Sequence, residues 1–437
     1  MTALLQHYFT KLDRGKTWRW RGQVLKSVGQ TIESAGPPAY VGECCEIEDK
    51  FALVHRAEVI GFRGSNVLLM PVESTEGIRY GDRVTALGSS PEIEVGSGLV
   101  GRVLNALGEP MDGGPRPAFS SLMPLAGAVR SPLDRLPIRE PLGTGIRALD
   151  AMLTVGRGQR VGIFGGSGVG KSTLIGMMTR NTAADVTVVG LVGERGREVG
   201  EFLQDALGEE GRARSVVVVS ASDQSPILRM RAALAATTVA EHFAAQGKHV
   251  LLVLDSLTRF AMAAREMGLA AGEPPTAKGY TPSVFTRLAR LVERAGRFRT
   301  GSITAFYTVL MEGDDQQDPL VDAVRSLLDG HIVLSRALAS EGWYPPIQVL
   351  DSISRLMPAV SSSEHREQAM LLRRLMAAYA RSEDLVRIGA YKPGADPDLD
   401  RALNAREQIR AYLTQDAHQR IEFAKCLEGL ENLVNEV

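Results

Sequence analysis

The stretch RVGIFGGSGVGKSTLIGMMTR, residues 160–180, decides the fold. It opens with a short apolar run, RVGIFG, that is typical of a buried strand, and it closes with a segment, TLIGMMTR, expected to be helical. Between them, residues 165–172 satisfy the pattern G-x-x-x-x-G-K-[ST]. A strand, this glycine-rich turn and a helix in that order predict a loop that binds phosphate groups, rather than a chance turn.

This phosphate loop, residues 165–172, predicts a site for ATP and Mg²⁺. Its glycines let successive backbone N–H groups surround phosphate oxygens, and the helix N-terminus adds a favourable partial charge. Lys171 is expected to reach the β and γ phosphates, and Ser172 is expected to offer its hydroxyl oxygen to Mg²⁺. The predicted nucleotide-binding residues here are Gly165, Gly166, Ser167, Gly168, Val169, Gly170, Lys171, Ser172 and Thr173.

Two acidic residues follow other apolar runs. Asp255 ends LLVLD, which places its carboxylate at the sheet edge where the phosphate loop also lies, and predicts that it organises the Mg²⁺ shell. A helix-capping acid is the alternative. Glu194 follows VTVVGLVG, where a carboxylate could polarise the attacking water, and Arg195 could stabilise charge on the leaving phosphate. By spacing alone, the segment ERGRE is also typical of a solvated helix start.

Two further candidates lie in WYPPIQ and LDSISR, residues 343–348 and 350–355. Tyr344 could stack on the adenine ring, because every base presents a π-face. A tyrosine beside two prolines is otherwise often a rigid packing residue. Arg355 taken alone is one arginine among many.

On either side of the phosphate loop, the predicted pattern of strands and helices changes along the chain. Residues 18–91 carry short β-rich runs separated by turn residues at intervals of about ten, which predicts a small barrel or sandwich. Residues 91–145 are rich in proline and glycine and are interpreted as a connection. From residue 145 to 360, apolar strands alternate with helices, which predicts a parallel sheet covered on both faces. After residue 361 only helical periodicity remains.

Composition limits the class of protein. The chain has 437 residues, a length that predicts about three domains. Its net charge of −1 argues against a basic protein that coats nucleic acid. No apolar run reaches membrane-spanning length, and the first residues lack a secretory signal. The three cysteines and seven histidines show neither disulfide nor metal spacing. We therefore expect a reduced, cytoplasmic protein whose only metal is Mg²⁺.

The N-terminal segment carries an apolar stripe at helical spacing. The stripe consists of Leu4, Leu5, Tyr8, Phe9 and Leu12. Five apolar side chains on a short helix must be covered, which predicts docking to a partner. Packing on the chain's own barrel and contact with a membrane surface through nearby basic residues are the alternatives.

Taken together, these stretches resemble the catalytic subunits of rotary ATPases and their type III export branch, most of all its flagellar members. The resemblance rests on GGSGVGKS, VGLVGERGREVGEF, GSITAFYTVLMEGDDQQDP and VLDSLTRFAMAAREMGLAAGEPPTAKGYTPSVF, with GYTPSVF and DDQQDP pointing to the export branch. It implies that Glu194 is the catalytic glutamate, that Tyr344 stacks on adenine, and that Arg355 is an arginine finger entering a neighbouring subunit's site.

The same resemblance implies function and partners. It implies ATP hydrolysis by a homohexameric ring that energises flagellar protein export, at the inner-membrane export apparatus. The implied partners are a stator-like regulatory protein at the N-terminal helix, a central stalk-like protein, the export gate, and export substrates with their chaperones. Alternatives are an injectisome ATPase, a non-catalytic nucleotide-binding ring subunit, and a hexameric RNA helicase, although no nucleic-acid partner is expected.

The predicted domains combine both lines of reasoning. They are an N-terminal docking helix (1–17), a β-barrel (18–92), a RecA-like ATPase domain with the segment that leads into it (93–360), and a helical C-terminal domain (361–437).

Overall fold

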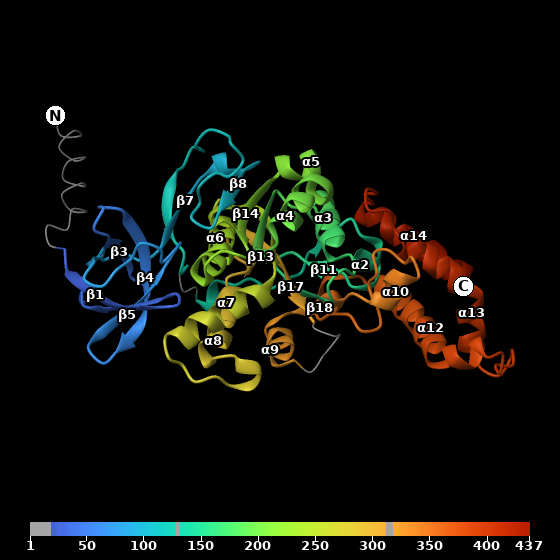
Figure 1. Cartoon of the computed structure of the whole chain (residues 1–437). Coiled ribbons are helices and arrows are strands. Elements are labelled where there is room, and N and C mark those ends of the chain that lie inside the picture. Colours follow the sequence, from blue (N-terminus) through green and yellow to red (C-terminus); the bar gives the residue numbers. More distant parts are fainter. Residues whose placement is uncertain (1–18, 128–130, 312–317) are drawn as a thin grey trace, which may run out of the picture.

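The computed structural model describes residues 19–127, 131–311 and 318–437. A β-barrel lies at the N-terminal end, a helix-covered sheet in the middle and helices at the C-terminal end, as Figure 1 shows. The predicted fold class is therefore confirmed. The predicted docking helix, residues 1–17, lies outside the described residues. Within the described ranges, no helix is long and apolar enough to cross a bilayer.

The N-terminal strands close into a barrel in the order β1-β2-β5-β4-β3-β6, and β6 pairs with β1. Neighbouring barrel strands run antiparallel. Alternate side chains fill the interior, and Ile32, Ile47 and Leu69 are fully buried there. The strands are β1 (Arg21–Val28), β2 (Thr31–Ala35), β3 (Cys44–Glu48), β4 (Val54–Arg63), β5 (Asn66–Pro71) and β6 (Arg83–Ala86).

The proline- and glycine-rich segment after the barrel is more than a connection. Its strand β8 (Val103–Asn105) joins the central sheet in parallel beside β14 (Ser215–Ala221). Three residues among prolines and glycines are too short for a periodic pattern, so sequence analysis missed this strand. The segment's other elements are β7 (Glu92–Val95), β9 (Ser121–Pro124), β10 (Pro141–Leu142), and the 3₁₀ turns η1 (Ser97–Leu99) and η2 (Pro132–Asp134).

The central sheet has the order β19-β18-β12-β17-β15-β13-β14-β8 and is parallel except at β19. Every apolar run predicted as a strand of this sheet is one. The remaining strands are β12 (Arg160–Gly165), β13 (Val186–Glu194), β15 (His249–Asp255), β17 (Ser302–Leu310), β18 (Gly330–Val333) and β19 (Ile353–Ser354), with β16 (Gly296–Arg297) against β17 and β11 (Val155–Gly156) against β10.

Both faces of the sheet are covered, because successive side chains of each strand point to opposite faces. In β15, Leu252 and Leu254 pack into one core cluster, whereas Leu251 and Val253 pack into the other. The first face is covered by α6 (Pro226–Ala245), α7 (Leu257–Ala270), α8 (Pro282–Val292) and α9 (Pro319–Leu327). The second carries α2 (Arg147–Met152), α3 (Lys171–Asn181), η3 (Phe202–Leu207) and, near it, α4 (Gly196–Glu201) and α5 (Gly208–Ala213).

The C-terminal helices continue this second core rather than forming a separate one. Leu372, Tyr412 and Leu430 share a cluster with residues of α2 and α3, and Figure 1 shows these helices extending away from the end of the sheet opposite the barrel. The helices are α12 (Ser363–Arg387), α13 (Pro397–Leu413) and α14 (Phe423–Glu436); η4 (Ala277–Gly279), α10 (Arg336–Ser340) and α11 (Met357–Val360) lie in earlier loops.

Candidate active site

The phosphate loop runs from the end of β12 into α3, as the sequence predicts. Gly168 and Gly170 have φ of +78° and +88°, a left-handed backbone conformation that favours glycine. No side chain caps the start of α3, and Ser172 and Thr173 are exposed there. The first N–H groups of this helix are therefore available to an anionic ligand.

Lys171 forms an ion pair with Asp255 across the sheet edge. Its Nζ lies 2.8 Å from Oδ1 of Asp255, and the two side chains are only 11% and 6% exposed. The hydroxyl of Thr308, on the intervening strand β17, donates to the same oxygen at 2.7 Å. In this structure the ammonium group thus compensates a buried carboxylate, which would otherwise be costly.

Asp255 does not cap the next helix, which was the alternative role for this residue. Ser256 is the N-cap of α7, and its hydroxyl oxygen accepts from the backbone N–H of Arg259 at 3.3 Å. The Asp255 carboxylate points instead to Lys171.

Glu194 ends β13, next to the strand that carries Asp255. Its carboxylate is half-buried, and Oε1 has no hydrogen-bond partner within the described part of the chain. Burial and the charge of Asp255 raise the pKa of Glu194, Lys171 opposes them, and a hydrogen bond with Glu198 adds to the rise, so that this pKa lies at about 7. A carboxyl that titrates near neutrality and has a free oxygen suits a proton-accepting role.

In the ERGRE segment, residues 194–198, both arginines are exposed. Arg195 is 75% exposed and pairs with Glu198 at 3.5 Å, and Arg197 pairs with Glu201 at 2.7 Å. These side chains form the solvated start of α4, which is the alternative that the sequence also offered for this segment. Glu194 turns inward and forms a hydrogen bond with Glu198, whereas the Arg195 guanidinium is exposed and pairs with Glu198.

Tyr344 lies beside the phosphate loop. A Cβ atom placed on Gly170 would lie 3.8 Å from the Tyr344 ring and from Pro346. The Tyr344 side chain is 48% exposed, so one side of the ring is open. A half-open aromatic ring beside the phosphate loop is available to stack on a base.

Arg355 lies at the opposite edge of the sheet. It follows β19, and its N–H donates to the carbonyl oxygen of Asp329 at 3.0 Å, at the amino end of β18. Because β12 runs parallel to β18 and spans about 17–20 Å, the phosphate loop lies roughly that far away. The exposed Arg355 side chain has no partner among the described residues and cannot reach its own phosphate loop.

The donor set beside the phosphate loop fits Mg²⁺. The Ser172 hydroxyl is exposed, and the Asp255 carboxylate lies at the same edge, so both offer the oxygen ligands that this ion prefers. Elsewhere in the described ranges, no group of three or more His, Cys, Asp or Glu residues is placed to hold a metal. A site with so few protein ligands suits an ion whose other ligands come from nucleotide phosphates and water.

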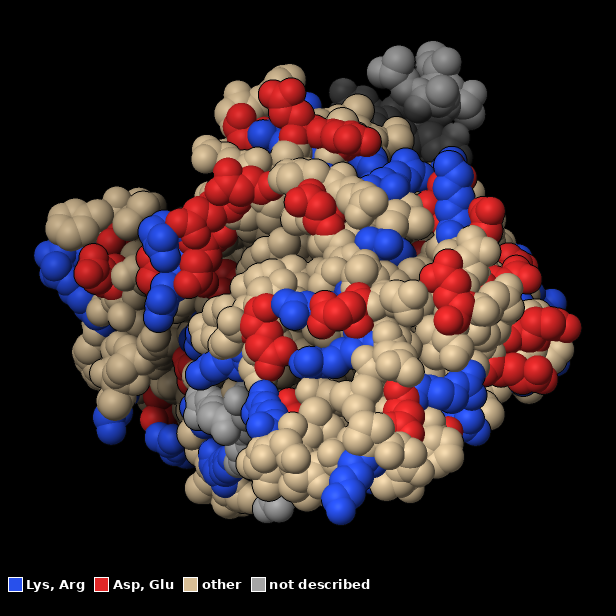
Figure 2. Space-filling model, turned by 90° about the vertical axis from the view of Figure 1, so that its right-hand side faces the viewer, with Lys and Arg blue, Asp and Glu red and all other residues tan. Residues whose placement is uncertain are grey.

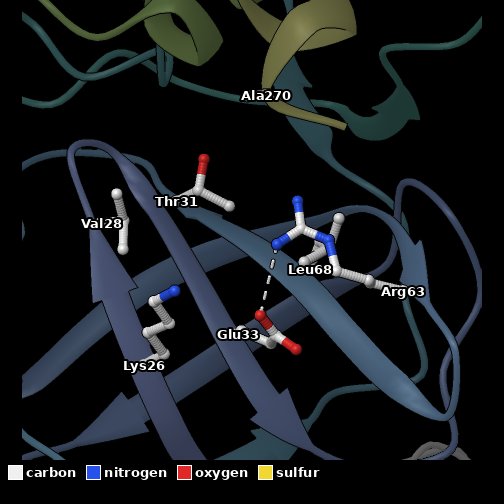
Figure 3. Close-up of a pocket in the computed structure, with 7 residues that line it drawn as sticks. All are labelled: Lys26, Val28, Thr31, Glu33, Arg63, Leu68 and Ala270. Carbon is white, nitrogen blue, oxygen red and sulfur yellow. Dashed lines mark hydrogen bonds and ion pairs between the residues drawn. The ribbon is translucent and has the colours of Figure 1, made fainter. Parts of the chain in front are cut away.

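A pocket at the barrel and the C-terminal face are two other surfaces of the described structure. Figure 3 shows a small pocket of about 170 Å³ where the barrel faces Ala270 of α7, with Arg63 reaching the carboxylate of Glu33. It holds one ion pair, and its other polar side chains are Lys26 and Thr31. Figure 2 shows basic and acidic side chains interspersed on the C-terminal face, without an extended patch of one sign.

The fold and this site define an ATPase: a phosphate loop on a parallel sheet, a lysine and aspartate pair, and an inward glutamate. The ATP synthase alpha/beta family matches the chain through its nucleotide-binding domain (residues 145–354) and its beta-barrel domain (24–88). The T3SS EscN ATPase C-terminal domain matches residues 361–432. The chain belongs to the ATP synthase alpha/beta family, as one of its type III export ATPases.

Relatives support this assignment along the whole chain. The flagellum-specific ATP synthase of Bacillus subtilis is 49% identical over 97% of each chain. The assembled ATPase EscN of the enteropathogenic E. coli type III secretion system is 43% identical, with a TM-score of 0.90, covering 94% of this chain and 100% of EscN. EscN in complex with its central stalk EscO gives a TM-score of 0.87 at 42% identity, with the same coverage.

Proposed function

We propose that this ATPase works as a homohexameric ring that hydrolyses Mg-ATP to energise flagellar protein export. The observation that carries the proposal is the arrangement at one sheet edge of Lys171, Asp255 and Glu194, with Arg355 at the far edge. A subunit so built has every group for hydrolysis except the arginine, which a neighbour in a ring would supply. The higher identity to a flagellar relative than to EscN favours the flagellar system.

The chain's own residues would act as follows. Lys171 leaves Asp255 for the β and γ phosphates of ATP, while the N–H groups at the start of α3 hold the phosphate oxygens. Ser172 and Asp255 would hold Mg²⁺, which when bound neutralises charge on the phosphates. Glu194 orients the attacking water and accepts its proton. Tyr344 stacks on the adenine ring.

Partners and domains extend the proposal. The ring would carry a central stalk-like protein, as assembled EscN does with EscO, and would meet a stator-like regulator, the export gate and chaperoned substrates. It would act in the cytoplasm at the inner-membrane export apparatus. The proposed domains remain 1–17, 18–92, 93–360 and 361–437. We also propose that Arg195 stabilises charge on the leaving phosphate. This role requires a shift of α4 that brings the guanidinium to the phosphates.

A complementation experiment tests the proposed system. The chain is expressed in a non-motile strain that lacks its own flagellar export ATPase, with the Lys171→Ala variant as the matched control. We expect restored swimming and restored export of flagellar subunits with the wild type alone. Restored secretion in an injectisome ATPase deletion strain, with no restored motility, would instead assign the chain to that system.

Glu194→Gln is expected to keep Mg-ATP binding while turnover falls roughly 10²-fold or more, because the amide keeps the shape but cannot accept a proton. Steady-state turnover and equilibrium binding of a fluorescent ATP analogue measure the two effects separately. Glu201→Gln is the control, because that carboxylate lies on α4, the helix that follows Glu194, and is half-exposed and paired with Arg197. Hydrolysis within a few-fold of wild type would mean that another group positions the water.

The pH dependence of kcat/KM should show the raised pKa of Glu194. The ionised carboxylate is the active form, so kcat/KM is expected to rise with pH through about 7. Glu198→Ala removes a hydrogen bond and a negative charge that both raise this pKa. The acidic limb of the profile should therefore move to lower pH in this variant. Both proteins use the same substrate, so titration of ATP itself cancels, and an unmoved limb would remove Glu194 from this role.

A further inference from the structure

Tyr344 and Arg355 are the two ends of a single segment, residues 344–355, which we name the connecting strip. The strip links the base-stacking tyrosine to the arginine at the far sheet edge. The short strand β19 is its only regular element in the described structure, so other parts of the chain must hold it. Figure 1 shows α10, which leads into the strip, lying between the central sheet and α12.

Gln415, which follows α13, holds the Tyr344 end. Its backbone N–H donates to the carbonyl oxygen of Tyr344 at 2.8 Å. Its side-chain amide donates to the carbonyl oxygen of Gly145 at 2.8 Å and accepts from the N–H of Arg147 at 3.0 Å. Gln415 is only 6% exposed. A buried amide with both its donor and its acceptor satisfied fixes this backbone firmly.

Arg373 of α12 holds the Arg355 end. Its guanidinium donates to the backbone carbonyl oxygens of Val349, Leu350 and Ser352. All three oxygens lie near the same nitrogen, Nη2, so its two hydrogens are shared among them. The last of these acceptors lies three positions before Arg355, so the guanidinium sets the path of the chain into that arginine.

The middle of the strip is anchored independently. The Ser352 hydroxyl donates to the carbonyl oxygen of Gln348 at 2.6 Å and accepts from the N–H of Val333 in β18 at 2.9 Å. Val349 and Ile347 are buried in the second core cluster. A disturbance at one end of the strip should therefore stay at that end, which makes the two ends separable by experiment.

We propose that Gln415 and Arg373 are positioning residues through which the C-terminal helices set the active site. Gln415 positions the base-stacking tyrosine of its own subunit, and Arg373 positions the arginine presented to the neighbouring subunit. The inference rests on the proposed function, which gives Tyr344 and Arg355 those roles. It makes the C-terminal helices part of nucleotide turnover, because a displacement of α13 would reach the Tyr344 end of the strip and a displacement of α12 would reach the Arg355 end.

For Gln415→Ala, we expect KM for ATP to rise while kcat stays within about twofold. The variant keeps the backbone bond to Tyr344 but loses the side-chain bonds to Gly145 and Arg147 that hold this backbone in place. The net worth of those bonds limits the expected rise to roughly 3- to 10-fold. Gln408→Ala is the matched control, since this glutamine on α13 is exposed and its one side-chain hydrogen bond within the described ranges is to Glu436, at 3.4 Å. Gln415→Met keeps a side chain of similar size without its hydrogen bonds and serves as a second variant if the alanine protein fails to fold.

For Arg373→Ala, the opposite split is expected: kcat falls roughly tenfold, through a misplaced transition-state group, while KM stays within about twofold. Arg373→Lys should recover part of kcat. Arg374→Ala is the control, because this neighbouring arginine is 57% exposed and pairs only with Asp398 among the described residues. Thermal unfolding of each variant shows whether the fold is kept.

Double variants decide whether each residue acts through its proposed target. Arg373→Ala should cause no further loss in an Arg355→Ala background, and Gln415→Ala should cause none in a Tyr344→Ala background. Additive losses, or changes in kcat and KM together in every variant, would mean a general structural role and would overturn the proposal. If Tyr344→Ala and Arg355→Ala themselves behave as wild type, the proposed function of those residues fails instead.

Discussion

Lys171→Ala is expected to abolish ATP hydrolysis and to weaken ATP binding strongly. The lysine is the cation of the phosphate loop, and its loss removes the charge that meets the β and γ phosphates. We expect turnover to fall by roughly 10³-fold or more, since positioning and charge stabilisation supply almost all of this catalysis. Turnover of the purified variant and equilibrium ATP binding measure both effects. Near-normal turnover would refute the phosphate-loop assignment.

The ion pair with Asp255 demands a control for this variant. Removing Lys171 leaves a carboxylate that is only 6% exposed without its partner, and an unpaired buried charge costs about 3–5 kcal/mol. The double variant Lys171→Ala/Asp255→Asn removes that charge as well. It should unfold at a higher temperature than Lys171→Ala and remain inactive, which separates lost catalysis from lost stability.

Arg355→Ala is expected to be nearly inactive, although Arg355 lies far from its own phosphate loop. Negative charge develops on the transferring phosphoryl group, and a guanidinium fixed there is worth roughly 10³- to 10⁵-fold in rate in related sites. Lysine should not substitute for it, because it lacks the planar set of donors. Retention of wild-type turnover by Arg355→Ala would remove this arginine from the mechanism.

Mixing two inactive variants tests whether Arg355 acts on a neighbour. In a ring that contains both Lys171→Ala and Arg355→Ala subunits, some interfaces pair an intact phosphate loop with an intact arginine. We expect such mixtures to recover a measurable fraction of turnover, under conditions where the wild type shows concentration-dependent activity. Rings built from only one of the two variants provide the control, because none of their interfaces has both an intact phosphate loop and an intact arginine.

Local signals made much of the site predictable. The phosphate loop is a contiguous pattern with its strand and helix attached, and the apolar runs before Glu194 and Asp255 place both acids at strand ends. Since parallel strands end at one edge of a sheet, the sequence predicts that these groups lie near one another. The ion pair between Lys171 and Asp255 realises that proximity.

Features that depend on strand order could not be predicted in this way. Thr308 meets Asp255 because β17 lies between β12 and β15, and no local pattern marks it. The position of Arg355 at the far edge follows from the antiparallel turn of β19 onto β18. Gln415 and Gly145 are 270 residues apart in the chain, so only the folded structure shows that they meet.

The closed barrel has a consequence for self-assembly. Each of its strands has a neighbour on both sides, so the barrel offers no row of unsatisfied backbone groups to another molecule. Contacts between copies through the described barrel strands would therefore not extend its sheet from one molecule into the next. Contacts of that kind, where they are ionic, weaken as salt is added. A subunit with such an end can gather and disperse repeatedly without the risk of fibre formation at its barrel.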